Sequence, residues 1–277
     1  MRIDSHQHFW RYDVQQYGWM QPDWPIRRDL LPADLAPLLA QNGFSGSVAV
    51  QARQCLDENR FLLGLADEFP QVRGVVGWVD LLSDRAEEQL TQFAAHPKFV
   101  GVRHVVQDEP DDFMLRSDFL RGIAALRQFK LTYDILIFPR QLPAAIKLVE
   151  RFPEQPFVLD HIGKPPIREG ILSPWREQMR LLAGFPNVYC KVSGMVTEAH
   201  WSTWKPDDFI PYFDVVFEAF SVKRLMYGSD WPVSLLAASY QQAWQLASDY
   251  VALMSEPDQD AFFGGNAAAF YGLGLDG

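Results

Sequence analysis

Cysteine is scarce in this sequence, and its scarcity limits the kind of fold that the chain can adopt. Among the 277 residues there are only 2 cysteines, Cys55 and Cys190, which lie far apart and in no Cys-x-x-Cys pattern. Two cysteines cannot form the disulfide framework that holds small secreted domains together. A single disulfide between them stays open, but we expect two buried thiols in a reducing compartment.

Long apolar runs and clusters of basic residues are also lacking. No apolar run approaches the ~18 residues that a membrane-spanning helix needs, and the start, MRIDSH, does not have the apolar segment of a signal peptide. Lys and Arg number 25 against 35 Asp and Glu, a net charge of −10 without the basic face of a nucleic-acid binder. We therefore expect a cytoplasmic protein with no membrane or nucleic-acid partner, and leave open whether it is a homo-oligomer.

Short apolar runs, in contrast, recur along the whole chain. Hydrophobic residues make up 48% of the sequence, which is enough for a large core. Eight runs read as strands, many of them apolar on nearly every residue, as strands buried on both faces of a parallel sheet are. They cover residues 2–6, 46–51, 72–79, 99–104, 131–137, 157–161, 188–193 and 224–229.

The stretches between these runs have helical character, and three of them end at a Phe-Pro pair. They cover residues 32–41, 57–69, 83–95, 117–129, 142–152, 173–185, 206–220 and 239–254, with a further helix expected over 257–271. Eight βα units bury their strands well in a closed barrel, because closure removes exposed sheet edges. The sequence thus predicts a single (β/α)₈ TIM-type barrel over residues 1–277 with an extra C-terminal helix, in line with the roughly 250 residues of such folds.

One connection is unusually long and aromatic. Residues 9–31 follow the first predicted strand and contain three Trp and two Tyr: Trp10, Tyr12, Tyr17, Trp19 and Trp24. Loops that follow the strands of a (β/α)₈ barrel lie at its C-terminal mouth, where active sites are found. These aromatic side chains fit either packing against the core or stacking on the C–H face of a sugar ring.

Two histidines end the first strand at a spacing of two. Because side chains of a strand alternate with period two, His6 and His8 are expected to point to the same side. Two converging imidazoles suit a divalent metal or a polarised carbonyl. Taken alone, such a pair more often consists of two polar residues that close a strand.

Two further polar residues end the sixth and eighth strands. His161 alone would fit a capping or core histidine, and Asp230 alone would fit the cap of the following helix. The barrel brings both residues to the rim that carries His6 and His8. Next to these histidines, Asp230 fits the role of a general base or of a fourth metal ligand.

With these motifs the sequence resembles the amidohydrolase superfamily, and within it the lactone-hydrolase branch of fuconolactone, rhamnonolactone and pyrone-dicarboxylate hydrolases. The motifs are DSHQHFW at 4–10, DHIGKP at 160–165 and GSDWP at 228–232, and the likeness extends over essentially the whole chain. The resemblance implies a barrel with water as the nucleophile. It also implies that His6, His8 and His161 form the site and that Asp230 is the base.

The sequence departs from the two-metal members of that superfamily. Those members have a bridging Lys or Glu at the end of strand 4 and a His after strand 5, whereas here strand 4 ends with Arg103 and His104. We therefore expect one divalent ion, of the zinc kind and held by His6, His8, His161 and Asp230, or none. Without an ion, Arg103 and the imidazoles would polarise the carbonyl themselves.

Other polar residues near strand ends are candidates for substrate binding. Arg103 fits a contact with substrate oxygens but also an ion pair with Asp108 or Glu109, and Lys191 is expected in an ion pair inside the barrel. The full set of substrate-binding candidates is Gln51, Arg53, Arg103, His104, Tyr133, Lys164 and His200.

The function that these residues favour is hydrolysis of a sugar lactone to the aldonic acid by an activated water. A metal-dependent decarboxylase of an aromatic or unsaturated acid is the alternative reaction, and a non-catalytic barrel that binds a sugar acid is the alternative from another class. A strand-8 base has no use in pure binding, which speaks against the last. The sugar configuration, the ring size and the charge of the lactone stay open.

Overall fold

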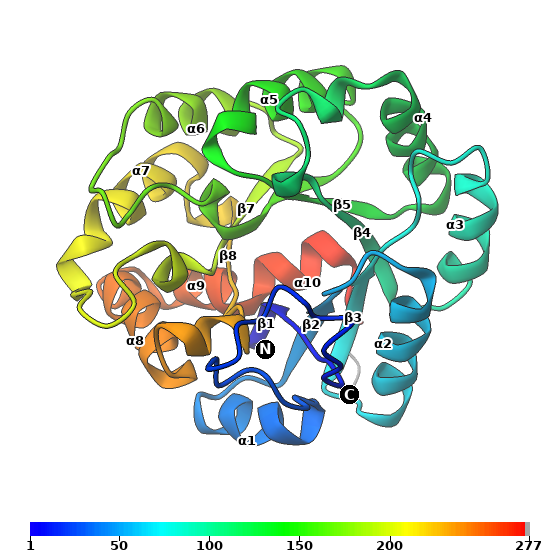
Figure 1. Cartoon of the computed structure of the whole chain (residues 1–277). Helices are drawn as coiled ribbons and strands as arrows, with labels where there is room; N and C mark the ends of the chain where they lie inside the picture. The colour runs from blue at the N-terminus through cyan, green and yellow to red at the C-terminus, as the bar shows by residue number, and fades with distance from the viewer. Residues whose placement is uncertain (275–277) are drawn as a thin grey trace.

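Eight parallel strands form one sheet that curls into a barrel (Figure 1). The computed structural model describes residues 1–274, and the strands follow one another around the barrel in chain order. They are β1 (Ile3–Gln7), β2 (Gly46–Val50), β3 (Val72–Gly77), β4 (Phe99–Val105), β5 (Thr132–Leu136), β6 (Phe157–Leu159), β7 (Val188–Val192) and β8 (Leu225–Tyr227). Each predicted strand is confirmed to within a few residues.

The barrel closes between β8 and β1 through the residues that carry the predicted site. Gln7 and Trp231 form an isolated parallel bridge. On either side of it, Asp230 N donates to His6 O at 2.8 Å and His8 N donates to Trp231 O at 2.7 Å. Closure of the sheet and assembly of the site therefore depend on the same main-chain contacts.

Helices surround the barrel, one after each strand (Figure 1). They are α1 (Pro32–Gln41), α2 (Leu56–Glu68), α3 (Ala86–Ala94), α4 (Ser117–Leu126), α5 (Leu142–Arg151), α6 (Trp175–Ala183), α7 (Ile210–Phe220) and α8 (Tyr240–Val251). All eight predicted helices are present, and the (β/α)₈ barrel is confirmed. Within residues 1–274 no helix combines the length and the apolar character that crossing a membrane requires.

The predicted extra helix is present but interrupted. It consists of α9 (Glu256–Asp260) and α10 (Asn266–Tyr271), joined by a π-helical segment, Ala261–Gly265. Gly264 within that segment lies against the start of β1, where a Cβ atom would come within 2.6 Å of Met1 O. The interruption lets the chain press against β1 and then turn across the end of the barrel.

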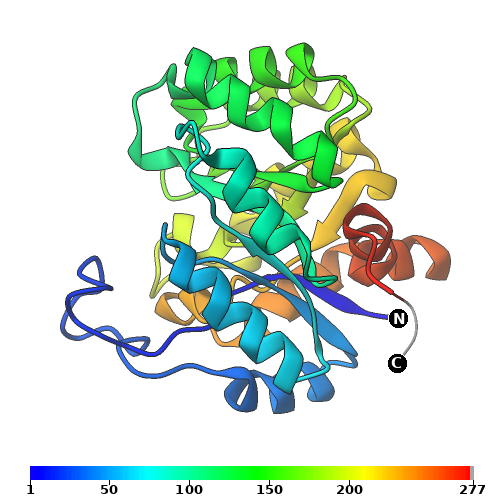
Figure 2. The same cartoon turned by 90° about the vertical axis from the view of Figure 1, so that its right-hand side faces the viewer.

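The interior of the barrel is apolar at its N-terminal end. A buried cluster there joins the inner faces of several strands to the C-terminal segment, which covers this end of the barrel (Figure 2). Its members are Ile3, Val48, Val50, Val76, Val158, Met226, Ala267, Ala268, Tyr271 and Leu273. We refer to these residues as the lower cluster. They leave the opposite end of the barrel, the mouth, as its open end.

The long loop after β1 packs beside the mouth and projects beyond it (Figure 2). Trp10 anchors it, because this residue pairs with Leu30 in an antiparallel bridge and is fully buried. Trp19 packs edge-on against Trp10 and Trp24, with ring centroids 6.2 and 6.0 Å apart. Trp24 in turn contacts Trp201 of the loop after β7 at 5.6 Å, so aromatic contacts connect two loops at the mouth.

Candidate active site

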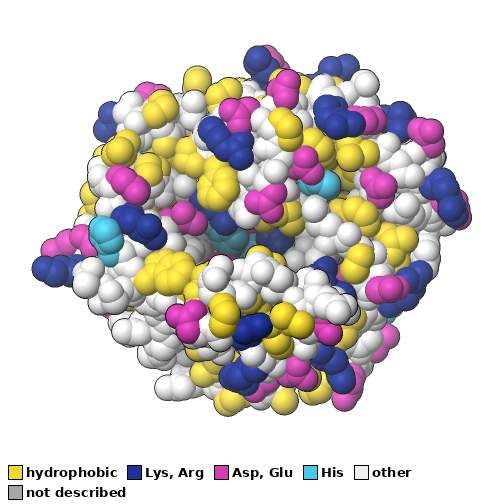
Figure 3. All heavy atoms as spheres, in the orientation of Figure 1, with side chains coloured by type: hydrophobic (Ala, Val, Ile, Leu, Met, Phe, Trp, Pro, Cys, Tyr) yellow, Lys and Arg dark blue, Asp and Glu magenta, His cyan; other side chains and the backbone are white. Residues whose placement is uncertain are grey.

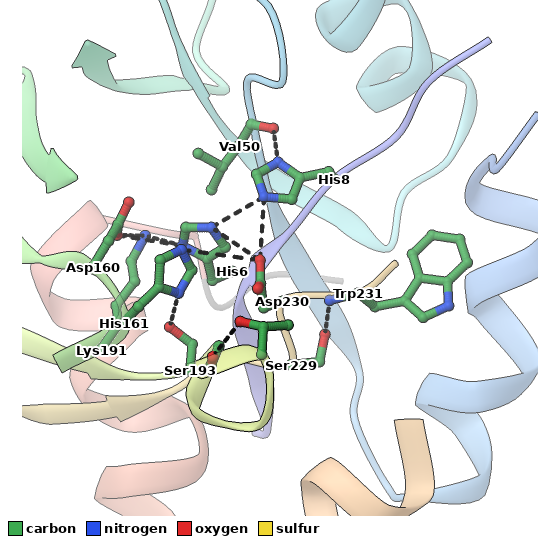
Figure 4. Close-up of polar contacts among 12 residues, drawn as sticks. His6, His8, Val50, Asp160, His161, Lys191, Ser193, Ser229, Asp230 and Trp231 are labelled. Carbon is green, nitrogen blue, oxygen red and sulfur yellow. Dashed lines mark hydrogen bonds and ion pairs between the residues drawn. The ribbon is translucent and has the colours of Figure 1, made fainter. Parts of the chain in front are cut away.

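His6 and His8 both point into the barrel, as the period of two predicts. Their Nε2 atoms lie 3.2 Å apart (Figure 4). The Nδ1 atom of His8 lies 2.8 Å from Val50 O. Because a carbonyl oxygen only accepts hydrogen bonds, Nδ1 carries the proton and the lone pair of Nε2 faces the centre of the site.

Asp230 lies at the centre of the three imidazoles. Its Oδ1 atom is 3.4 Å from Nε2 of His8, 3.8 Å from Nε2 of His6 and 4.0 Å from Nε2 of His161 (Figure 4). The other ring nitrogen of His161 is 2.9 Å from Ser193 Oγ, which fixes the orientation of that ring. The structure thus brings together all four residues that the sequence motifs singled out.

The backbone of the site is strained at two of these residues. His161 and Asp230 both have φ 54°, and Ile162 and Lys164 next to His161 have φ 49° and 50°. Left-handed backbone costs roughly 1–2 kcal/mol per non-glycine residue and is found preferentially at functional sites. Gly194 allows this arrangement, since a Cβ atom there would lie 2.6 Å from His161 Nδ1.

A layer of buried charges lies directly below the histidines. Asp160 accepts a hydrogen bond from Arg103 Nη1 at 3.0 Å, and its Oδ1 atom lies 3.1 Å from Lys191 Nζ and 3.3 Å from Nδ1 of His6. Lys191 also pairs with Asp134 at 2.5 Å. The predicted ion pair of Lys191 inside the barrel is confirmed, and Arg103 pairs with Asp160 rather than with Asp108 or Glu109.

Burial and neighbouring charges fix the protonation of the site. Burial lowers the pKa of His6 well below its ordinary value, with Lys191 contributing and Asp160 opposing. Burial also lowers the pKa of His161 to about 4. For Asp230 burial alone would raise the pKa, but the imidazoles, that of His161 foremost, hold it below its ordinary value. At neutral pH the site therefore combines the neutral imidazoles of His6 and His161 with the ionised carboxylate of Asp230.

This donor set fits one divalent cation. The ligand atoms of His6, His161 and Asp230 all lie within 4.8 Å of one another, and His8 contacts two of these residues. Neutral imidazole nitrogens and a carboxylate oxygen are the ligands that zinc accepts. Arg103 Nη1 lies 3.4 Å from Nε2 of His6, so a fixed positive charge stands next to the site and opposes a second ion.

A cavity of about 670 Å³ opens above these residues at the mouth. Figure 3 shows it as a hollow on this face, with histidine and basic side chains at its floor. Of the predicted residues, six line it: His8, Arg53, Arg103, His161, Lys164 and Asp230. His6 lies fully buried beneath the floor.

Four of the predicted substrate-binding residues do not line this cavity. His104 points from β4 toward the helices, where it stacks on Phe113 with ring centroids 5.0 Å apart. Tyr133 is likewise buried, and its ring packs edge-on against Phe119 of α4 with ring centroids 5.9 Å apart. His200 lines a separate surface cavity of about 390 Å³, and Gln51 is buried with its Nε2 donating to the carbonyl of Arg103 at 3.3 Å.

Several residues that sequence reasoning did not select do line the cavity. They are Trp10, Gln16, Trp19, Ala52, Gln54, Cys55, Val105, Gln107, Asp108, Leu136, Thr197 and Val233. Cys55 is half-buried rather than buried, and both it and Cys190 are free thiols. Most of these residues belong to loops, and only the aromatic residues of the first loop stood out in the sequence.

The chain matches a known protein family. The family model described as amidohydrolase matches residues 3–273, nearly the whole described chain. The chain belongs to the amidohydrolase family. The family assignment agrees with the resemblance that the three motifs suggested.

Two curated relatives are similar to this chain over nearly their full length. The chain is 41% identical to the L-fucono-1,5-lactonase of Burkholderia multivorans, covering 99% of this chain and 96% of the relative. It is 39% identical to the L-fucono-1,5-lactonase of Burkholderia ambifaria, covering 98% and 95%. A crystal structure of an amidohydrolase from Burkholderia multivorans with bound zinc superposes with a TM-score of 0.95, at 41% identity, over 99% of this chain and 100% of that one.

Proposed function

We propose that this protein is a lactonase that hydrolyses a sugar lactone, such as L-fuconolactone or L-rhamnonolactone, to the aldonic acid. The observation that carries the proposal is the position of Asp230, a carboxylate with three imidazole nitrogens within 4.0 Å of its Oδ1 atom at the floor of an open cavity. The two similar L-fucono-1,5-lactonases support it.

Asp230 acts as the general base. Its pKa is held below the ordinary value for Asp, so the carboxylate is ionised at neutral pH and accepts a proton from the attacking water. The oxygen of that water forms a bond to the lactone carbonyl carbon. When the bond from that carbon to the ring oxygen breaks, Asp230 returns the proton to the departing alcohol, and the aldonic acid is released.

Positive charge at the floor stabilises the negative charge that develops on the carbonyl oxygen. Arg103 lines the cavity, and its ion pair with Asp160 holds the guanidinium in place. Hydrogen-bond donors that are fixed before the reaction stabilise a developing oxyanion without reorganisation. The hydrogen bonds of the His8 and His161 rings to Val50 and Ser193 fix the orientation of these two rings beside Asp230.

A single zinc-like ion fits the site, held by His6, His161 and Asp230 with His8 beside them. When bound, such an ion supplies Lewis-acid polarisation of the lactone carbonyl. The similar structure described with bound zinc supports this assignment. The free thiols of Cys55 and Cys190 agree with a reducing compartment, and we propose that the protein acts in the cytoplasm.

A pH-indicator assay with a panel of sugar lactones tests the proposal. The metal-stripped and the zinc-loaded protein are each incubated with L-fuconolactone, L-rhamnonolactone and their stereoisomers, and elemental analysis gives the number of ions per chain. We expect acid release from at least one sugar lactone and no more than one ion. Failure of both forms to open any lactone would refute the function, and two ions per chain would refute the metal assignment.

A further inference from the structure

Three glutamines line the cavity on three different loops. Gln16, Gln54 and Gln107 follow β1, β2 and β4. The amide oxygen of each one accepts a hydrogen bond from a group of the protein that can only donate. The donors are, in the same order, Arg53 Nη1, the main-chain NH of Val105 (2.8 Å) and Lys164 Nζ (2.7 Å).

These bonds determine which atom of each amide is left for a ligand. Because guanidinium, peptide NH and ammonium groups cannot accept a hydrogen bond, the oxygen of each glutamine must face its partner. Within residues 1–274 none of the three amide nitrogens has a protein acceptor. Each glutamine therefore keeps two N–H donors available at the cavity.

The cationic side chains that line the cavity, Arg53, Arg103 and Lys164, stand against the lining carboxylates Asp108 and Asp230, and two of these cations are also paired with carboxylates below the surface, so the balance of charge favours an uncharged ligand over an anion. Arg53 pairs with the buried carboxylate of Glu58 at 2.8 Å, and Arg103 pairs with Asp160 at 3.0 Å. Neutral amide donors suit the oxygens of hydroxyl groups, whereas a carboxylate is bound more strongly by uncompensated cations.

We propose that Gln16, Gln54 and Gln107 form an amide triad that binds the hydroxyl oxygens of a neutral polyhydroxylated lactone and so determines which lactones the enzyme prefers. This inference rests on the proposed function and deepens it, because it assigns recognition of the hydroxyl groups to three named side chains. Residues at the floor of the cavity contact the ring ester, and the triad contacts the hydroxyl groups of the sugar.

Glutamine-to-glutamate substitutions remove the donors, keep the length of the side chain and add one negative charge. Gln107→Glu keeps the oxygen that Lys164 contacts and replaces the NH₂ group by a second oxygen, and Gln16→Glu does the same opposite Arg53. Gln54→Glu replaces the NH₂ group of the third glutamine and keeps the oxygen that the main-chain NH of Val105 contacts. The matched control is Gln15→Glu, which adds the same charge to the same loop one residue away, at an exposed position outside the cavity lining.

The kinetic test compares a sugar 1,5-lactone with δ-valerolactone, which has the same six-membered ester ring but no hydroxyl groups. The added charge acts on the ester chemistry of both substrates, so the ratio of their kcat/KM values isolates the contacts to the hydroxyls. We expect this ratio to fall about three- to tenfold for each triad variant, the range for one neutral hydrogen bond. The loss should appear in KM of the sugar lactone, and Gln15→Glu should leave the ratio at its parent value.

Binding measurements keep this inference separate from the proposed function. Calorimetry with the sugar 1,5-lactam and with δ-valerolactam, neither of which is readily hydrolysed, reports on the triad without turnover. A similar selective loss of affinity for the sugar lactam would support the triad even if the protein opened no lactone. An unchanged ratio in both the kinetic and the binding experiment, or no binding of the sugar lactam to the parent protein, would overturn it.

Discussion

The two ends of the barrel interior differ in the polarity of the side chains that fill them. The lower cluster consists of apolar side chains closed off by α10. Above it lie Arg103, Asp134, Asp160 and Lys191, all buried and compensated mainly by one another. Apolar burial stabilises a fold in proportion to the area removed from water, whereas buried ion pairs are often no more stabilising than apolar residues of similar size.

The backbone shows the same contrast. Four of the six non-glycine residues with left-handed backbone belong to the mouth, namely His161, Ile162, Lys164 and Asp230. Strain and buried charge thus occur together where His6 and Asp230 must be oriented. We infer from this difference that the apolar lower end stabilises the fold. The strained and charged upper end lowers that stability, and it holds the site in one geometry.

Lys191→Met should show the largest effect on stability, because it removes a cation from the upper layer, the buried charged residues Arg103, Asp134, Asp160 and Lys191. The substitution keeps the length of the side chain but leaves Asp134 and Asp160 without their shared cation. We expect a loss of about 3–5 kcal/mol in the free energy of unfolding, the cost of removing one partner of a buried ion pair. Urea denaturation followed by circular dichroism measures it. We also expect kcat to fall, since Lys191 lies 3.1 Å from Nδ1 of His6.

Met226→Ala in the lower cluster is the matched control. It removes a fully buried apolar side chain and should cost about 2–5 kcal/mol through the cavity that it leaves. Its kcat should stay close to that of the parent protein. If both variants lost stability and activity in the same proportion, the two ends of the interior would not differ in the way proposed.

A smaller effect is expected at the boundary between the two ends. Tyr271 belongs to the lower cluster, yet its hydroxyl donates a hydrogen bond to Asp134 Oδ2 at 2.9 Å. Tyr271→Phe removes that bond and keeps the ring, so we expect a loss of about 1.5 kcal/mol, the lower limit for a hydrogen bond to a charged group. The same urea titration measures it. A loss as large as that of Lys191→Met would mean that α10, rather than the ion pairs, holds the upper layer together.

The sequence predicted the scaffold and the centre of the site because both depend on local signals. Apolar runs between helical stretches located all eight strands, and the alternation of side chains along β1 placed His6 and His8 on one side. His161 and Asp230 were found because strand ends in a barrel share one rim. None of these inferences required knowledge of how neighbouring strands are aligned.

Two of the substrate-binding candidates, His104 and Tyr133, lie outside the cavity because strand alignment decides which of two adjacent residues points inward. Arg103 and His104 are neighbours on β4, so only one of them can face the interior, and the structure directs His104 toward Phe113. On β5 the same ambiguity favoured Tyr133, whereas Asp134 faces inward to Lys191. Which of two adjacent residues points inward depends on contacts with the neighbouring strands, and one sequence does not contain that information. The cavity glutamines were missed because nothing distinguishes them from other polar loop residues.

The most direct test of the central claim is the kinetics of Asp230→Asn on the preferred sugar lactone, with metal-stripped and zinc-loaded enzyme. The substitution keeps the shape of the side chain and removes the base. We expect kcat to fall by about 10²–10⁴-fold, with an unchanged circular dichroism spectrum and with lactone binding retained. Near-parental activity of this variant would contradict the account, since Asp230 would then be a structural residue at the end of β8 and the proposed mechanism would be wrong.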